Sequence, residues 1–152
     1  MKPILISLFF FLLFFTFTNT LGMNEQNVTQ NGKEENVGSE NTDNLVVLWT
    51  SGDPEVAKKM VFMYVYNAKK AGWWKKITFI IWGPSSKLLA EDKELQSKIK
   101  DMKEVGIKLE ACKACSDQYG VSDKLEALGV DVKYMGEPLT DYIKKDYHVI
   151  TF

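Results

Sequence analysis

Five short apolar runs, separated by segments with helical spacing, constrain the fold of this chain more than any other feature. They predict strands at 45–50, 76–82, 107–111, 130–135 and 148–152. Continuous apolar runs are typical of strands buried on both faces, as in parallel sheets. Gly72, Gly106 and Gly129 each follow a predicted helix, as helix-to-strand loops prefer. The alternation predicts an α/β domain with three α/β/α layers and a mostly parallel five-stranded sheet.

The starts of the predicted helices carry recognisable signals. Asp53 is expected to cap the first helix, with Pro54 at its first position. Ser85 or Ser86 is expected to cap the helix that follows the second strand. The run at 130–135 alternates apolar and polar residues, which predicts a less covered strand.

The N-terminal segment predicts export. Lys2 precedes an apolar run from Ile4 to Phe17, and small or polar residues follow up to Gly22. This pattern fits a signal peptide at 1–22 and a periplasmic or extracellular protein. The run is shorter than the about 20 residues of a membrane span, so no stable span is expected after cleavage. An uncleaved anchor is the alternative, because the cleavage region lacks an Ala-x-Ala pattern.

The remaining chain divides into a polar segment and one folded domain. Residues 23–43 are almost entirely polar and cannot bury enough apolar surface to fold, so they predict a disordered linker. Residues 44–152 have the usual size of a single domain. The net charge of −1 predicts no broad basic face for nucleic acid.

Both cysteines of the chain, Cys112 and Cys115, lie where the third predicted strand meets a helix. Backbone N–H groups and the helix dipole favour a thiolate at such a junction. Cys112 is the candidate nucleophile, and its sulfur is expected to be reachable at the mouth of a crevice. Cys115 is the candidate resolving thiol or, equally, a small apolar side chain. Two cysteines and His148, the only histidine, give no support for a zinc site with four side-chain ligands, and no cofactor is predicted.

Ligands of open parallel sheets bind outside the carboxyl ends of the strands. The loops 50–53, 83–86, 112–115 and 136–138 are expected to share that edge. The candidate binding residues there are Ser51, Trp82, Ser85 and Gly136, with Trp82 as a wall. The two serines are equally well explained as residues that form turns and caps.

Several segments together resemble the DsrE-like (DsrE/DsrF-like) family of small sulfur-relay proteins over 45–152. The resemblance lies in Thr50–Asp53, Ile80–Ser85, Val105–Ile107, Ala111–Cys115, Tyr134–Thr140 and Val149–Phe152. It implies a flavodoxin-like parallel sheet and assembly into trimers or hexamers. It also implies that a cysteine at the position of Cys112 carries sulfane sulfur as a persulfide between donor and acceptor proteins.

Three functions follow as hypotheses. The first is a sulfur carrier, a possible sulfurtransferase, in which Cys112 takes up sulfur and Cys115 releases it or closes a disulfide. The second is a non-catalytic module that binds a small ligand or a protein at the sheet edge. The third is a thiol–disulfide oxidoreductase that uses both cysteines, which their spacing allows.

Overall fold

A computed structural model describes residues 43–152, which form a five-stranded sheet in the order β4-β3-β2-β1-β5. All neighbouring strands are parallel. The predicted signal peptide and all but the last residue of the predicted linker lie outside the described residues. Every predicted strand is present with slightly different ends, and the predicted fold class is confirmed. The strands are β1 (Asn44–Trp49), β2 (Lys76–Ile81), β3 (Lys108–Cys112), β4 (Asp131–Lys133) and β5 (His148–Thr151).

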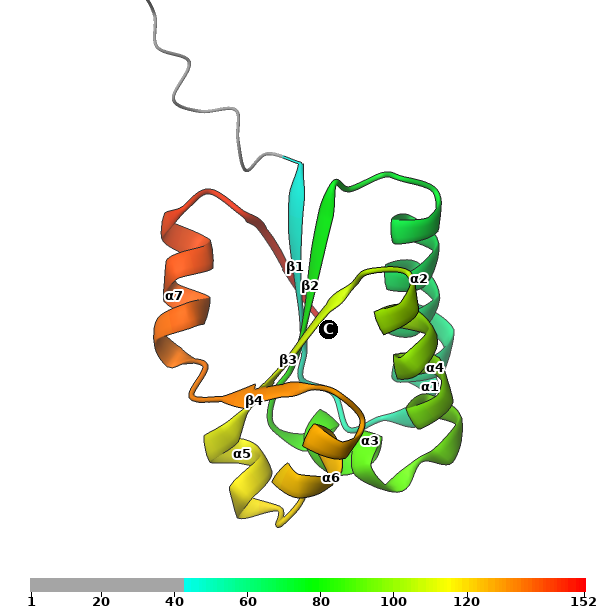
Figure 1. Ribbon diagram of the computed structural model, residues 1–152, viewed down its shortest axis with the longest axis vertical. Helices are drawn as coiled ribbons and strands as arrows, with labels where there is room; N and C mark the ends of the chain where they lie inside the picture. Colours follow the sequence, from blue (N-terminus) through cyan, green and yellow to red (C-terminus); the bar gives the residue numbers. More distant parts are fainter. Residues whose placement is uncertain (1–42) are drawn as a thin grey trace, which may run out of the picture. The chain divides into compact units, whose positions relative to one another are not determined.

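The two faces of the sheet are covered unequally. Helix α7 lies on one face, and α2 and α4 lie on the other (Figure 1). The larger apolar core is on the α2 and α4 side, where Trp49 stacks on Phe79 at 5.8 Å and meets Phe62 edge-on at 5.2 Å. The helices are α1 (Pro54–Val56), the π-helical turn η1 (Ala57–Val61), α2 (Phe62–Lys70), α3 (Pro84–Glu91), α4 (Lys93–Glu104), α5 (Lys113–Gln118), α6 (Ser122–Ala127) and α7 (Gly136–Lys144).

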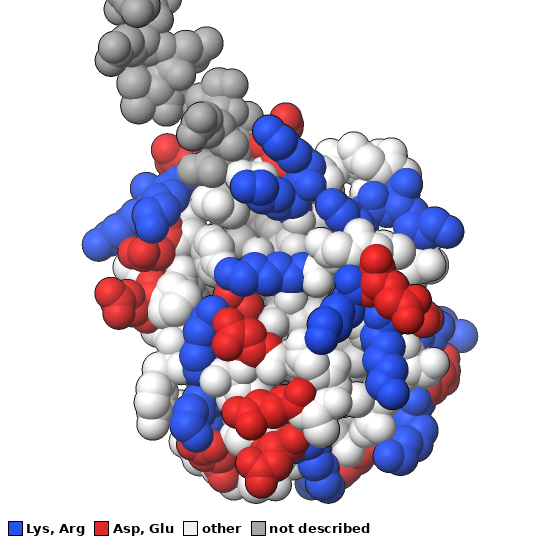
Figure 2. Space-filling model, viewed as in Figure 1, with Lys and Arg blue, Asp and Glu red and all other residues white. Residues whose placement is uncertain are grey.

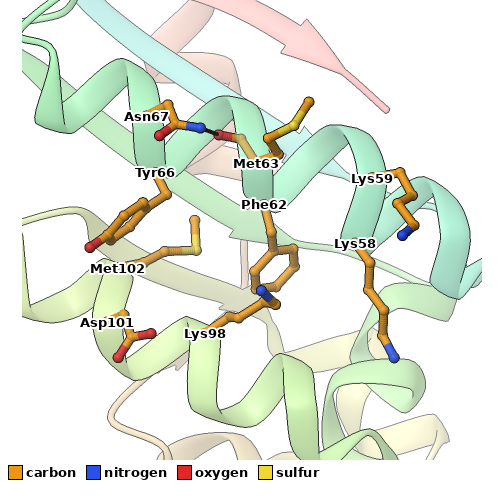
Figure 3. Close-up of a pocket in the computed structure, with 9 residues that line it drawn as sticks. All are labelled: Lys58, Lys59, Phe62, Met63, Tyr66, Asn67, Lys98, Asp101 and Met102. Atoms are coloured by element: carbon orange, nitrogen blue, oxygen red, sulfur yellow. Dashed lines mark hydrogen bonds between the residues drawn. The ribbon is translucent and has the colours of Figure 1, made fainter.

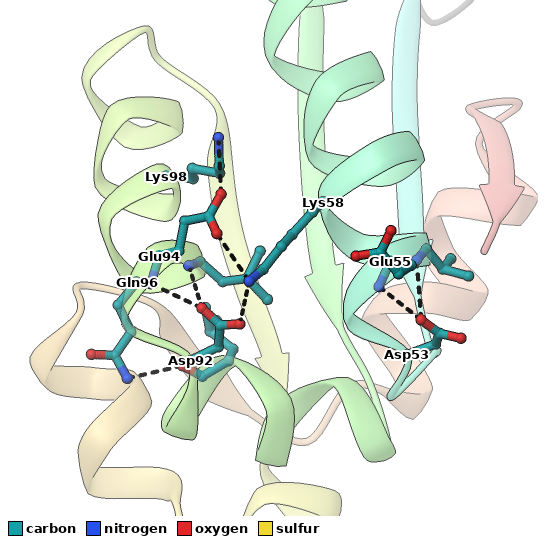
Figure 4. Close-up of polar contacts among 10 residues, drawn as sticks. Asp53, Glu55, Lys58, Asp92, Glu94, Gln96 and Lys98 are labelled. Atoms are coloured by element: carbon teal, nitrogen blue, oxygen red, sulfur yellow. Dashed lines mark hydrogen bonds and ion pairs between the residues drawn. The ribbon is translucent and has the colours of Figure 1, made fainter.

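The first helix begins as predicted and then widens. The Asp53 carboxylate accepts hydrogen bonds from the backbone of Glu55 and Val56, so it caps α1 (Figure 4). The backbone N–H of Phe62 then donates to the carbonyl of Ala57, five residues back. This π-helical turn was not foreseen, because an apolar run at helical spacing does not reveal one extra residue in a turn.

The predicted serine cap of α3 is wrong. The residue that precedes α3 is Gly83, whose φ of 68° few other residues adopt, and no side chain caps this helix. Ser85 and Ser86 lie inside the helix and are buried. A side-chain cap occurs instead at the next helix, where Asp92 accepts hydrogen bonds from the backbone of Glu94 and Leu95.

Ion pairs connect the two helices on the more heavily covered face. The ammonium of Lys58, on η1, lies 2.8 Å from Asp92 and 2.9 Å from Glu94 (Figure 4). Asp92 therefore both caps α4 and pairs with Lys58 of η1. Within residues 43–152, none of the helices combines the length and the apolar character that crossing a membrane requires.

Candidate functional site

The cysteine pair lies where β3 runs directly into α5, at the carboxyl edge of the sheet. Cys112 is the last residue of β3 and the residue before α5, and Cys115 lies one turn into that helix. The smaller apolar cluster, on the α7 face, contains Cys112 together with Val46, Ile80 and Met135. Cys112 is only 4% exposed, so this residue is more enclosed than its sequence position predicts. Cys115 is half-buried and is the more accessible thiol.

The two thiols are free and interact with each other. Burial raises the pKa of Cys115 above its ordinary value of 9.0, and a hydrogen bond with Cys112 raises it further. A hydrogen bond from the backbone of Gly83 acts in the opposite direction but does not cancel these effects. Cys115 is therefore held as a protonated thiol near neutral pH, next to the sulfur of Cys112.

The other predicted site residues are distributed along the same edge. Trp82 is half-buried and packs on the apolar cluster that contains Cys112. Cys115 packs on the same cluster. Gly136 is exposed at the start of α7. Ser51 accepts a hydrogen bond from the backbone of Asp53, which makes it a turn-forming residue. The structure thus brings Trp82 together with both cysteines.

Ser85 has a structural role in the same region. Its hydroxyl donates to the carbonyl of Trp49 at 2.7 Å and accepts from the backbone N–H of Trp82 at 3.0 Å. The end of β1 is thereby tied to the end of β2. The serine is buried, so its hydroxyl belongs to the frame behind the site.

Lys113 lies beside the cysteines, but its charge is largely compensated. Its ammonium binds both carboxylate oxygens of Asp117, at 2.8 and 2.9 Å. The Ser122 hydroxyl donates to the same carboxylate and lies 2.7 Å from the hydroxyl of Ser116. This network joins α5 to α6 and fixes the helix that carries Cys115.

Sequence reasoning missed Glu110, which lies two residues before Cys112 on β3. Its carboxylate is completely buried and accepts from Lys108 at 2.6 Å, Lys133 at 2.7 Å and the Tyr142 hydroxyl at 3.1 Å. Side chains alternate along a strand, so Glu110 and Cys112 project from the same face of the sheet. The available signal was the pair of Lys108 and Glu110, two residues apart in a predicted buried strand and therefore on one face of it.

Two basic groups keep this buried carboxylate ionised. Burial alone would raise the pKa of Glu110, but the hydrogen bonds from Lys108 and Lys133 outweigh burial and lower it. Burial would likewise lower the pKa of Lys108, and its hydrogen bonds to Glu110 and Tyr142 raise it instead. The cluster is therefore a charged network in which every member has a partner.

Two cavities lie away from the cysteines. A polar cavity of about 320 Å³ lies beside Glu110, and residues of β3, β4 and α7 line it. A second cavity of about 370 Å³ lies between α2 and α4, and Phe62, Met102 and Lys98 are among the residues that line it (Figure 3). The surface seen in Figure 2 mixes acidic and basic side chains rather than gathering one sign.

The single histidine lies away from the cysteines, at the start of β5. His148 is on the edge strand β5, and its ring lies 5.1 Å from that of Trp74. His148 therefore belongs to the edge of the sheet, where it packs on an aromatic ring. Within the described part of the chain, no three His, Cys, Asp or Glu side chains are grouped as a metal site would require.

Comparison with known proteins places the chain in a family. No curated protein sequence matches it. The structure is similar to that of the conserved protein of unknown function BT1422 from Bacteroides thetaiotaomicron, with 41% identity and a TM-score of 0.70, over 72% of this chain and 95% of that one. It shares its fold with the YchN protein from E. coli, with 15% identity and a TM-score of 0.53, over 74% of this chain and all of that one. The model of the DsrE/DsrF-like family matches residues 44–152, and the chain belongs to this family.

Proposed function

We propose that this protein carries sulfur as a persulfide on Cys112, with Cys115 as its partner thiol. The observation that supports this proposal best is the contact between two free thiols at the carboxyl edge of the sheet. Family membership is consistent with a role in sulfur relay. The apolar surroundings of Cys112 suit a persulfide, because they keep water and oxidants away from a reactive sulfur.

The proposed uptake step is a thiol exchange. The Cys112 thiolate attacks the outer sulfur of a donor persulfide, the donor S–S bond breaks, and the donor leaves as a thiolate. In delivery, an acceptor thiolate attacks the outer sulfur of the Cys112 persulfide, and the Cys112 thiolate leaves. Neither step changes the total number of electrons, so no separate oxidant is needed.

Cys115 offers a second way to release the sulfur. Its thiolate attacks the inner sulfur of the Cys112 persulfide, a Cys112–Cys115 disulfide forms, and hydrosulfide leaves. A small thiol reductant then restores both thiols. Because Cys112 is only 4% exposed, we propose that Trp82 or Cys115 moves aside when a donor approaches.

The test is sulfur loading followed by mass spectrometry. The purified protein is incubated with an inorganic polysulfide as donor and alkylated, and the peptide that contains Cys112 is analysed. One added sulfur atom on Cys112, absent in Cys112→Ser and retained in Cys115→Ser, is the expected result. Loading that persists in Cys112→Ser would assign the carrier role to another residue.

A thiol–disulfide oxidoreductase is the second candidate, because the same two thiols are close enough to interact. An oxidoreductase ends its reaction with a Cys112–Cys115 disulfide, whereas a carrier ends uptake with an added sulfur atom on Cys112. Catalysed insulin reduction, together with a Cys112–Cys115 disulfide and no added sulfur after polysulfide treatment, would favour it. A carrier is expected to take up sulfur and to reduce insulin no faster than free thiols do.

Export, partners and assembly are part of the same proposal. We propose cleavage after Gly22, transfer to and from donor and acceptor proteins, and assembly into trimers or hexamers. An intact mass of the protein recovered from the cell exterior or periplasm tests cleavage, because retention of the first 22 residues would indicate an anchor. Light scattering during size-exclusion chromatography tests assembly, and a monomeric mass would reject it.

A further inference from the structure

A charged cavity lies between α7 and the sheet, on the same face of the sheet as Cys112 but not lined by either cysteine. Its volume is about 320 Å³, within the range of small-molecule sites. At its inner wall lies Glu110, whose carboxylate is fully buried and bound to Lys108, Lys133 and Tyr142. A buried charge is costly unless it is paired, so a polar wall of this kind is unusual in a sheet core.

The cavity presents both signs of charge at close range. Three amines and three carboxylates line it, so its formal charges balance. Most of these groups pair with one another, Lys108 and Lys133 with Glu110 and Lys145 with Asp141. A ligand that carries both an ammonium and a carboxylate can join this network without adding a net charge. The lining residues with charge are Lys108, Lys133, Lys145, Glu110, Glu137 and Asp141.

The cavity and Cys112 are neighbours on one sheet face. Glu110 and Cys112 are two residues apart on β3, which separates their Cα atoms by roughly 7 Å along the strand. Tyr142 connects the two places, because its hydroxyl donates to Glu110 while its ring packs on the apolar cluster that contains Cys112. A ligand only a few atoms long can reach from the charged cavity toward the sulfur once that ring moves.

We propose that this cavity binds a small zwitterionic thiol of the amino-acid type and presents its sulfur to Cys112. The binding itself stands on the cavity alone, whereas the sulfur exchange rests on the function proposed above. The ligand thiolate attacks the outer sulfur of the Cys112 persulfide, the Cys112 thiolate leaves, and the ligand departs as a persulfide. Electrons and atoms balance without a further reactant.

A purely structural role for the cluster makes a different prediction. If Glu110 only attached α7 to the sheet, its substitution would lower the stability of the fold, and there would be no ligand binding for the substitution to weaken. Buried ion pairs are often replaceable by apolar residues without loss of stability, so stability alone does not explain a carboxylate at this position. The test therefore measures binding and folding separately.

The binding experiment uses the purified Cys112→Ser/Cys115→Ser variant, in which no mixed disulfide can form. L-cysteine is titrated while ¹H–¹⁵N chemical shifts are followed, with cysteamine and 3-mercaptopropionate as ligands that lack one of the two charges. We expect saturable shifts of cavity residues with L-cysteine and binding at least about tenfold weaker for both comparators. No saturable shift up to about 10 mM L-cysteine would overturn the proposal.

Substitutions then assign the binding to the charged wall. Added to this double variant, Glu110→Gln is expected to weaken L-cysteine binding at least about tenfold, and Lys108→Gln supplies a second test if Glu110→Gln unfolds. Glu104→Gln, an exposed carboxylate on α4, is the matched control and is expected to change nothing. Undiminished binding in a folded Glu110→Gln or Lys108→Gln variant would overturn the proposal.

The outcomes separate this proposal from the proposed function. L-cysteine binding without sulfur loading of Cys112 would leave the cavity assignment intact and remove the carrier. Sulfur loading without L-cysteine binding would keep the carrier and show that its acceptor uses another surface.

Discussion

The thiol of Cys115 shares a hydrogen bond with the sulfur of Cys112, one helical turn away. Burial and this contact both raise the pKa of Cys115. Because the raised pKa belongs to Cys115, this thiol keeps its proton at pH values where an exposed cysteine begins to ionise. The protonated thiol of Cys115 therefore lies next to the more enclosed sulfur of Cys112.

Alkylation of Cys115 should require a higher pH than alkylation of an ordinary cysteine. Only the thiolate reacts with iodoacetamide, so the midpoint of the rate against pH should lie above 9.0. Cys112→Ala removes the hydrogen bond and should lower this midpoint, although burial still keeps it raised. The measurement is labelling followed by peptide mass spectrometry. An unchanged midpoint in Cys112→Ala would show that the thiols do not interact.

The fold was predictable from the sequence because its signals are local. Apolar runs marked the strands, and Asp53 before Pro54 marked the start of the first helix. The sequence did not predict that α3 lacks a side-chain cap and that the next helix, α4, is capped by Asp92. Gly83 adopts the backbone conformation that precedes α3. The Ser85 hydroxyl, inside that helix, instead connects the end of β1 to the end of β2. This contact joins residues that are distant in the sequence, so a local sequence pattern does not reveal it.

The site was only partly predictable for a related reason. The strand-to-helix junction located both cysteines, but how deeply Cys112 is buried depends on side chains from β1, β2 and the loop before α7. Glu110 was overlooked although Lys108, two residues before it on the same face of the strand, is one of its partners. Its other partners are distant in the sequence. Lys133 and Tyr142 come within reach only when β4 and α7 fold back over β3.

Glu110→Gln should destabilise the protein at neutral pH. The change removes the charge that two ammonium groups share, and breaking a wholly buried ion pair costs about 3–5 kcal/mol. The side chains of Lys108 and Lys133 are 57% and 34% exposed, so water compensates in part. We therefore expect a loss of about 2 kcal/mol in the free energy of unfolding, measured by urea denaturation. A loss no larger than that of Glu104→Gln would contradict it.

The same carboxylate predicts how stability depends on pH. The pKa of Glu110 is lowered from its ordinary value of 4.5 by folding, so the folded state binds a proton less readily than the unfolded state. Its stabilisation is fully present above that value and is lost as the pH falls through the lower, folded pKa. Between about pH 5 and pH 3, the wild type should lose more stability than Glu110→Gln. Parallel curves for the two proteins would show that Glu110 does not couple to folding.

Asp92 both caps α4 and pairs with Lys58, and two substitutions can distinguish the contributions of these interactions to stability. Asp92→Ala removes the hydrogen bonds to the first turn of α4 and should cost about 1 kcal/mol, the usual value for a lost cap. Asp92→Asn keeps a capping oxygen and loses only the charge that meets Lys58, so its effect should be smaller. Thermal unfolding of the two variants gives the comparison. Equal losses would mean that the charge rather than the cap stabilises this junction.

Trp82 is expected to control access to Cys112. Its ring packs on the apolar cluster around this cysteine, which is only 4% exposed. Trp82→Ala should therefore raise the alkylation rate of Cys112 several-fold, while Trp82→Phe keeps most of the cover and should change it little. The rates are compared at one pH by peptide mass spectrometry, with Trp73→Ala as a control at an exposed tryptophan elsewhere. Equal Cys112 rates in wild type and Trp82→Ala would show that a donor enters by another route.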